Sequence, residues 1–247
     1  MLVRGLGRSA SYWLEFRLLL ERERRVVVFD NRGVGRSDTP PLFWSTADMA
    51  DDAALVLEES GVERADVFGI SLGGMISQHL ALRHPHRVER LVLACTSPGG
   101  SVAKRISPEA ALALARTARM SPREAQATNA RWVLSPEYLE ASPEIVDTWA
   151  GIAASEPRST RGLLGQVAAA ARHDAWRLLP HLTHETLVLT GDEDRLMPPE
   201  NSVHIHRRLP RASIDYLRGA GHDFPTERPR ETAERVLAFC QGPGSPC

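Results

Sequence analysis

Three short apolar runs, each continuous rather than alternating with polar residues, constrain the fold of this chain most strongly. They occupy residues 25–29, 66–70 and 90–94 and are rich in β-branched side chains. A run without polar alternation suits a strand that is buried on both faces, as in a parallel sheet. Helical patterns at 47–59, with Thr46 as the expected N-cap, and at 74–83 separate the runs. This alternation of strands and helices predicts right-handed crossovers and an α/β fold with a mostly parallel sheet.

The second half of the chain first departs from this alternation and then restores it. Residues 96–180 contain no strand-like run, and helical stretches at 108–120, 122–133, 136–139 and 143–154 follow one another, each with proline at the start. Strand patterns return at 186–190 and 212–217, and helical patterns at 200–208 and 229–240. We therefore predict a core of residues 1–95 and 181–241, a helical cap inserted at 96–180, and a flexible Gly- and Pro-rich tail at 242–247.

Composition excludes several classes of function. Thirty basic residues balance 31 acidic ones among 247, which gives no electrostatic reason to expect a nucleic-acid or anionic-membrane partner. The three cysteines form no CxxC pair, which argues against a disulfide framework and a zinc–cysteine site. No apolar stretch reaches the ~18 residues of a membrane span, and the N-terminus lacks a signal-peptide core. We expect a cytoplasmic protein.

A G-x-S-x-G motif lies where the strand pattern at 66–70 gives way to a helix. It comprises Gly69, Ser71 and Gly73, and the glycines permit a tight turn that projects Ser71 Oγ as a nucleophile. The N–H of Leu72 would point from the helix start toward an oxyanion. The same motif also fits an ordinary strand-to-helix corner, so the rest of the chain must decide.

A candidate acid and a candidate histidine follow the two later strands. Asp194 comes after the strand pattern at 186–190, and His222, preceded by a glycine, comes after the one at 212–217. All three candidates then lie beyond the carboxyl ends of parallel strands, where open α/β sheets bind ligands. The order Ser71, Asp194, His222 predicts a nucleophile, a base and a residue that orients the base.

These motifs resemble those of the α/β-hydrolase family, and more narrowly the small serine hydrolases that include esterases, enol-lactonases and cofactor-free haloperoxidases. The resemblance covers nearly the whole chain through the motifs at 4–7, 29–37, 69–74, 191–198 and 221–222. It implies the α/β-hydrolase fold, no cofactor, Asp194 rather than Asp192 as the acid, and the backbone N–H of Leu6 as the second oxyanion donor.

Two departures from the family pattern stand at the N-terminus. Arg4 occupies the place of the usual histidine in the oxyanion loop, so the orientation of that loop is open. The β-hairpin that usually precedes the loop is absent from this sequence, which begins almost directly on it. A sheet shortened in this way exposes an edge strand, and we expect a homodimer through that edge.

The predicted reaction is hydrolysis of a small-molecule carboxylic ester through an acyl-enzyme. A lactonase or a perhydrolase would use the same triad, and a non-catalytic ligand-binding protein of this fold is a further alternative. Met75, Trp132 and Trp149 are candidates for the substrate pocket, although aromatic residues on cap helices also serve as cap core. The paired histidines elsewhere lack accompanying carboxylates or cysteines, so no metal site is assigned.

Overall fold

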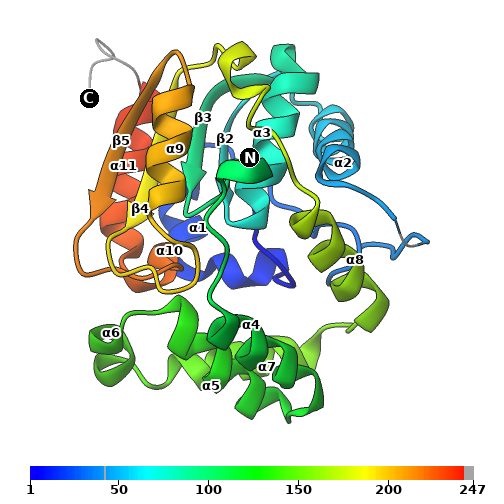
Figure 1. Ribbon diagram of the computed structural model, residues 1–247, viewed down its shortest axis with the longest axis vertical. Helices are drawn as coiled ribbons and strands as arrows, with labels where there is room; N and C mark the ends of the chain where they lie inside the picture. Colours follow the sequence, from blue (N-terminus) through cyan, green and yellow to red (C-terminus); the bar gives the residue numbers. More distant parts are fainter. Residues whose placement is uncertain (42, 242–247) are drawn as a thin grey trace.

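A five-stranded, entirely parallel sheet forms the centre of the molecule in a computed structural model that describes residues 1–41 and 43–241 (Figure 1). Its strands lie side by side in sequence order, and they are β1 (Leu2–Val3), β2 (Ala65–Ile70), β3 (Val88–Ala94), β4 (Thr186–Gly191) and β5 (Ala212–Leu217). The predicted parallel α/β architecture is thereby confirmed. The tail predicted at 242–247 lies outside the described residues.

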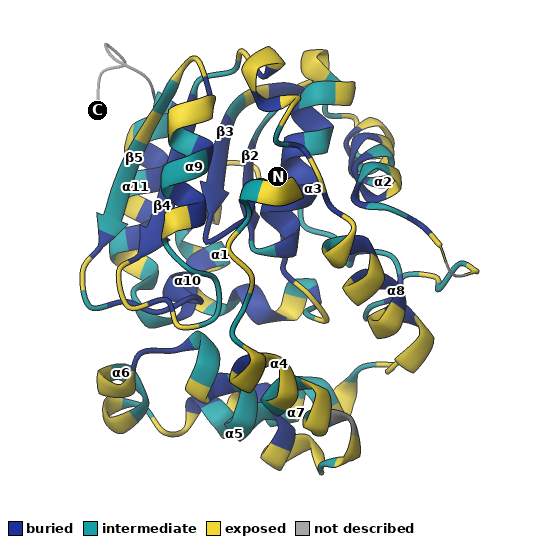
Figure 2. Ribbon diagram, viewed as in Figure 1, coloured by how far each residue is buried: buried dark blue, intermediate teal, exposed yellow. Residues whose placement is uncertain are grey.

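Helices cover both faces of this sheet because successive strand side chains point in opposite directions. Phe68 and Ile70 pack on the face covered by α1 (Leu14–Glu21) and α11 (Pro229–Gln241). Val67, on the opposite face, packs among the apolar side chains of α2 (Thr46–Glu59), α3 (Leu72–Arg83) and α9 (Glu200–Arg208). The central strands β2, β3 and β4 are largely buried between the two layers (Figure 2). The predicted continuous apolar runs are therefore explained by burial on both faces.

The segment predicted as a cap is mostly helical between residues 108 and 171. It contains α4 (Pro108–Arg116), α5 (Pro122–Val133), α6 (Pro136–Ala141), α7 (Ile145–Ser155) and α8 (Thr160–Ala171). A serine side chain caps every one of these helices except α7, and proline opens the first three. The helices α4 to α7 lie together beyond the end of the sheet toward which the strand arrows point (Figure 1).

Helix α8 was missed by the sequence patterns and packs against the core rather than with α4 to α7. Gln166 on α8 accepts a hydrogen bond from the Gly7 N–H at 2.9 Å and donates one to the Arg32 carbonyl at 3.0 Å. Arg172 donates to the Trp44 carbonyl at 2.9 Å. Part of the predicted cap segment therefore supports the loop that follows β1.

The strand predicted at 25–29 is wrong in extent. Only Val28 forms an isolated parallel bridge, to Leu2, and the Leu2 N–H donates to the Val27 carbonyl. The neighbouring β1 has two residues, so it offers the segment too short a partner for a continuous ladder. Val26 to Val28 are half-buried at this edge of the sheet. The dimer expected through the edge stays a prediction.

The N-cap of α2 is a second correction. Ser45, not Thr46, caps this helix: its side chain accepts from the Asp48 N–H, and Asp48 accepts in turn from the Ser45 N–H. Thr46 is buried instead, with its hydroxyl 3.1 Å from His173 Nδ1. The reciprocal capping box favours serine one position earlier because both side chains then satisfy free backbone donors.

The remaining described elements are short. They are α10 (Phe224–Glu227) and the 3-10 helices η1 (Ala10–Trp13), η2 (Pro85–Arg87), η3 (Gly100–Val102), η4 (Thr117–Arg119) and η5 (Leu179–His181). No helix within residues 1–41 or 43–241 has the length and apolarity needed to cross a membrane.

Candidate active site

Ser71 stands in a strained turn between β2 and α3. Its backbone has φ 57° and ψ −121°, a conformation that non-glycine residues rarely adopt. The two flanking glycines are sterically required: a Cβ at Gly69 would lie 2.3 Å from Ser77 Oγ, and one at Gly73 would lie 2.0 Å from the Val3 carbonyl oxygen. The G-x-S-x-G motif thus folds as a sharp elbow, with Ser71 at its apex.

The loop after β1 lies directly against this elbow. A Cβ added to Gly5 would be 3.2 Å from Ser71 Cβ and 3.7 Å from Ser71 Oγ. Leu72 opens α3, where backbone N–H groups have no partner within the helix. Within the described part of the chain, neither the Leu72 N–H nor the Leu6 N–H has a hydrogen-bond acceptor. Both N–H groups predicted to stabilise an oxyanion are therefore free to donate to it.

Asp194 and His222 are joined in a buried pair. Asp194 Oδ2 lies 2.7 Å from His222 Nδ1, while Asp194 Oδ1 accepts from the backbone N–H groups of Leu196 at 2.9 Å and Met197 at 2.8 Å. Asp192, the alternative acid, is exposed and accepts instead from the Gly219 N–H. The loop after β4 therefore directs Asp194, and not Asp192, at the histidine.

The link from Ser71 to this pair is less close. Both residues are described, and no hydrogen bond joins Ser71 Oγ to His222. Hydrogen bonds between a nucleophile and its base are often long before substrate binds and tighten in the complex. The structure thus brings the acid and the histidine into contact, and presents the serine on the elbow beside the oxyanion loop.

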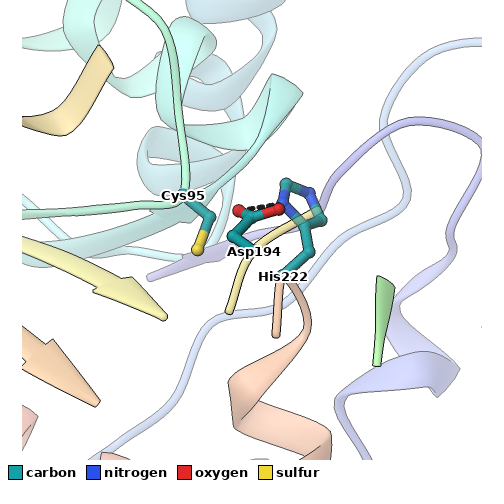
Figure 3. A group of neighbouring side chains, drawn as sticks. All are labelled: Cys95, Asp194 and His222. Atoms are coloured by element: carbon teal, nitrogen blue, oxygen red, sulfur yellow. Dashed lines mark hydrogen bonds and ion pairs between the residues drawn. The ribbon is translucent and has the colours of Figure 1, made fainter. Parts of the chain in front are cut away.

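The electrostatics of His222 and Cys95 differ. Burial lowers the pKa of His222, but the charge and hydrogen bond of Asp194 outweigh it, so the pKa lies above its ordinary value. Cys95 Sγ groups with Asp194 and His222, with ligand atoms within 4.8 Å of one another (Figure 3). Burial, followed by the charge of Asp194, raises the pKa of this thiol well above its usual range. Cys95 therefore contributes a buried, neutral thiol beside the acid–histidine pair.

Arg4 is the most informative residue that the sequence did not explain. Only 2% exposed, it donates two hydrogen bonds to Asp223, at 2.9 Å to Oδ1 and 2.7 Å to Oδ2, and a third to the Tyr12 carbonyl at 3.0 Å. Its guanidinium lies 4.6 Å from the centre of the Trp13 ring. Because Asp223 follows His222 directly, this buried pair ties the oxyanion loop to the histidine loop.

A second buried tie joins the histidine loop to the cap. Glu227 accepts hydrogen bonds from the Gly221 N–H at 2.9 Å and from the N–H and hydroxyl of Ser135 at 3.1 and 2.8 Å. Ser135 is the N-cap of α6, and the Asp223 N–H donates to the Val133 carbonyl at the end of α5. Burial raises the pKa of Glu227 to about 7. The cap, through Ser135, and the loop that carries His222, through Gly221, therefore donate to one carboxylate.

The three residues predicted to line the pocket differ in their burial and in the residues around them. Met75 is buried in the apolar core on α3, and its N–H donates to the Ser71 carbonyl. Trp149 is fully buried in a cap cluster with Tyr12, and its ring centre lies 3.9 Å from the Arg8 guanidinium. Trp132 is half-buried on α5. Their assignment to a substrate pocket stays a prediction.

The comparisons with known proteins agree with this architecture. Residues 1–229 match the model of the α/β hydrolase fold family. A protein of Caulobacter segnis named "Putative carbamate hydrolase RutD" is 29% identical over 250 residues, which are 98% of this chain and 91% of that protein.

Solved structures give the same result. An esterase from Thermogutta terrifontis is 28% identical with a TM-score of 0.79, over 97% of this chain and 88% of the other. The enol-lactonase from Burkholderia xenovorans LB400 is 23% identical with a TM-score of 0.84, over 98% and 90%. This second likeness concerns the fold alone.

Proposed function

Because the chain belongs to the α/β-hydrolase fold family, we propose that it is a serine hydrolase that cleaves carboxylic esters through an acyl-enzyme on Ser71. One observation carries this proposal: Ser71 occupies a strained elbow beside two free backbone donors, in a fold that also holds a buried Asp194–His222 pair. Strained backbone in a folded protein is typical of functional positions. A structural corner would need neither the strain nor the paired histidine.

In the proposed first step, Ser71 Oγ attacks the ester carbonyl while His222 removes its proton. Asp194 accepts a hydrogen bond from Nδ1, so Nε2 is the ring nitrogen that takes the proton. The carboxylate of Asp194 then stabilises the imidazolium that forms. The N–H groups of Leu72 and Leu6 stabilise the negative charge that develops on the carbonyl oxygen. His222 then protonates the leaving alcohol, and the acyl group remains on Ser71.

In the second step water replaces the alcohol. His222 takes a proton from water, the hydroxide attacks the acyl carbonyl, and the carboxylic acid leaves as Ser71 regains its proton. No cofactor is needed for either step. Removing a triad residue costs several orders of magnitude in turnover, and removing one oxyanion donor about 10²–10³.

A carbamate is the second candidate substrate, because a relative that matches nearly the whole chain bears that name. Carbamate cleavage would use the same nucleophile and the same base, with an amine or alcohol as leaving group. Lactone hydrolysis and perhydrolysis likewise differ only in the leaving group or the attacking nucleophile. Relative rates on matched esters, lactones and carbamates, and on acetate with peroxide, separate these activities.

The test is hydrolysis of p-nitrophenyl esters from acetate to decanoate by the wild type, Ser71→Ala and Ser213→Ala. Ser213 is an exposed serine on β5 and serves as the matched control. We expect turnover and a single fluorophosphonate adduct in the wild type and in Ser213→Ala, and neither in Ser71→Ala. Folded wild-type protein without turnover or adduct would refute the proposal and favour a non-catalytic binding role.

A further inference from the structure

Arg8 is a cation without a carboxylate partner at the junction of cap and core. Among the ion pairs of the described residues none includes Arg8, and its Nη1 is buried without a hydrogen-bond partner. The guanidinium is instead held by two rings, 4.2 Å from the centre of Tyr12 in the core and 3.9 Å from that of Trp149 in the cap. The two rings stabilise its charge, while Nη1 has no hydrogen-bond acceptor.

The backbone of Arg8 is hydrogen-bonded to the loop that lies against Ser71. Its N–H donates to the Gly5 carbonyl at 3.3 Å, and Gly5 is the residue that lies against Ser71. Tyr12 and then the carboxylate of Asp223 raise the pKa of Arg8, but both oxygens of Asp223 already accept from Arg4. Arg8 is therefore a surplus positive charge beside the oxyanion loop and the histidine loop.

An unpaired buried cation is costly to a folded protein, because its hydration is lost and nothing replaces it. Burial lowers the pKa of Arg8 to about 10, which still leaves it charged at neutral pH. The residue as a whole is half-buried, so part of its surface is exposed to solvent. A planar guanidinium with an N–H that lacks an acceptor matches the geometry of a carboxylate.

We propose that Arg8 binds a free carboxylate on the substrate, so that the preferred esters carry a carboxylate in addition to the bond that is cleaved. The inference rests on the proposed serine-hydrolase activity. The carboxylate belongs either to the acyl group, as in a dicarboxylic half-ester, or to the alcohol. Arg8 replaces the hydration of that carboxylate with charge-assisted hydrogen bonds, and the carboxylate supplies the partner that Nη1 lacks.

Two substrate pairs that differ only in this charge test the proposal. Mono-p-nitrophenyl glutarate is compared with its methyl ester for a carboxylate on the acyl side, and 3-acetoxybenzoate with its methyl ester for one on the alcohol side. The quantity measured is the ratio of kcat/KM for the charged and the neutral member of each pair. The variants are Arg8→Gln, Arg8→Lys, and Arg36→Gln as an exposed-arginine control.

We expect the wild type to prefer the charged member of one pair, and Arg8→Gln to lower that ratio by about 10- to 100-fold. Arg8→Lys retains part of the preference because the charge remains, and Arg36→Gln retains all of it. A ratio unchanged in Arg8→Gln, with both members slowed equally and a lower Tm, would overturn the proposal. Arg8 would then serve only to hold Trp149 of the cap against the core.

A binding measurement separates this inference from the proposed activity. Glutarate is titrated calorimetrically into Ser71→Ala and into Ser71→Ala/Arg8→Gln, neither of which needs to turn over. We expect the second protein to bind glutarate at least 10-fold more weakly. Equal affinities would refute the carboxylate site even if the esterase is active, whereas a wild type without turnover or adduct refutes the activity and leaves this comparison valid.

Discussion

Removing the Asp223 charge should destabilise the protein far more than removing an identical charge at the surface. Asp223 accepts both Nη groups of Arg4, and the two side chains are 7% and 2% exposed. In Asp223→Asn the Arg4 cation stays buried against a neutral amide. Leaving one partner of a buried pair uncompensated costs about 3–5 kcal/mol.

The matched control is Asp51→Asn. Asp51 pairs with Arg83 at 2.9 and 2.7 Å, nearly the geometry of the buried pair, and its Oδ1 also lies 2.7 Å from His84 Nε2. Its side chain is 41% exposed and that of Arg83 48%. Exposed pairs contribute about 0–1 kcal/mol because water competes for both ions. Urea unfolding of the two variants therefore measures what burial adds to the same chemistry.

The same variant should also slow catalysis, because Arg4 and Asp223 place the oxyanion loop and His222. A displacement of about 1 Å at a reacting group costs on the order of 10²-fold in rate. We expect kcat to fall at least 10-fold in Asp223→Asn and in Arg4→Met, and the double variant to be less damaged than the sum of the two. Additive effects, or a loss of stability no larger than that of Asp51→Asn, would show that other contacts position these loops.

Three further outcomes follow from the site. Gly73→Ala should abolish turnover and lower Tm in a thermal melt, because its Cβ would meet the Val3 carbonyl at 2.0 Å; an unchanged melt would contradict the close approach. The kcat/KM for a neutral ester should rise with pH with a midpoint above 6.5, the ordinary histidine pKa, since Asp194 favours protonated His222; in Asp194→Asn the midpoint should fall. Glu227, with a pKa raised from 4.5 to about 7, stabilises the fold below pH 4.5 and loses this contribution as pH rises through 7; chemical unfolding from pH 4 to 8 should show a decline of about 1–3 kcal/mol that is reduced in Glu227→Gln.

The fold and the order of the catalytic candidates could be predicted because each depends on local chemistry. A continuous apolar run predicts a doubly buried strand, and the runs at 66–70 and 90–94 fall within β2 and β3. The run at 25–29 has the same composition but forms a single bridge, because strand formation there depends on the length of β1 and not on its own residues. Partner length is a tertiary property that periodicity does not record.

The contacts that hold the site together could not be predicted from the sequence for a related reason. Arg4 and Asp223 are 219 residues apart, and Ser135 and Glu227 are 92 apart. Nothing in the neighbourhood of either member indicates the other, and at the surface each charge would be unremarkable. Only burial makes an acidic partner obligatory for Arg4, and burial of that position follows from the packing of the whole domain.

Arg4 shows how one local difference in sequence changes the long-range contacts of the site. The family resemblance places a histidine there, and a histidine can be buried as a neutral ring, whereas an arginine brings its charge with it. The chain accommodates the charge with an aspartate taken from the loop that carries His222, and with the Trp13 ring and the Tyr12 carbonyl. Both carboxylate oxygens of Asp223 accept hydrogen bonds from Arg4, so Asp223 does not pair with Arg8, which lies four residues after Arg4. The same substitution that fastens the oxyanion loop to the histidine loop therefore leaves the second cation open to an anionic ligand.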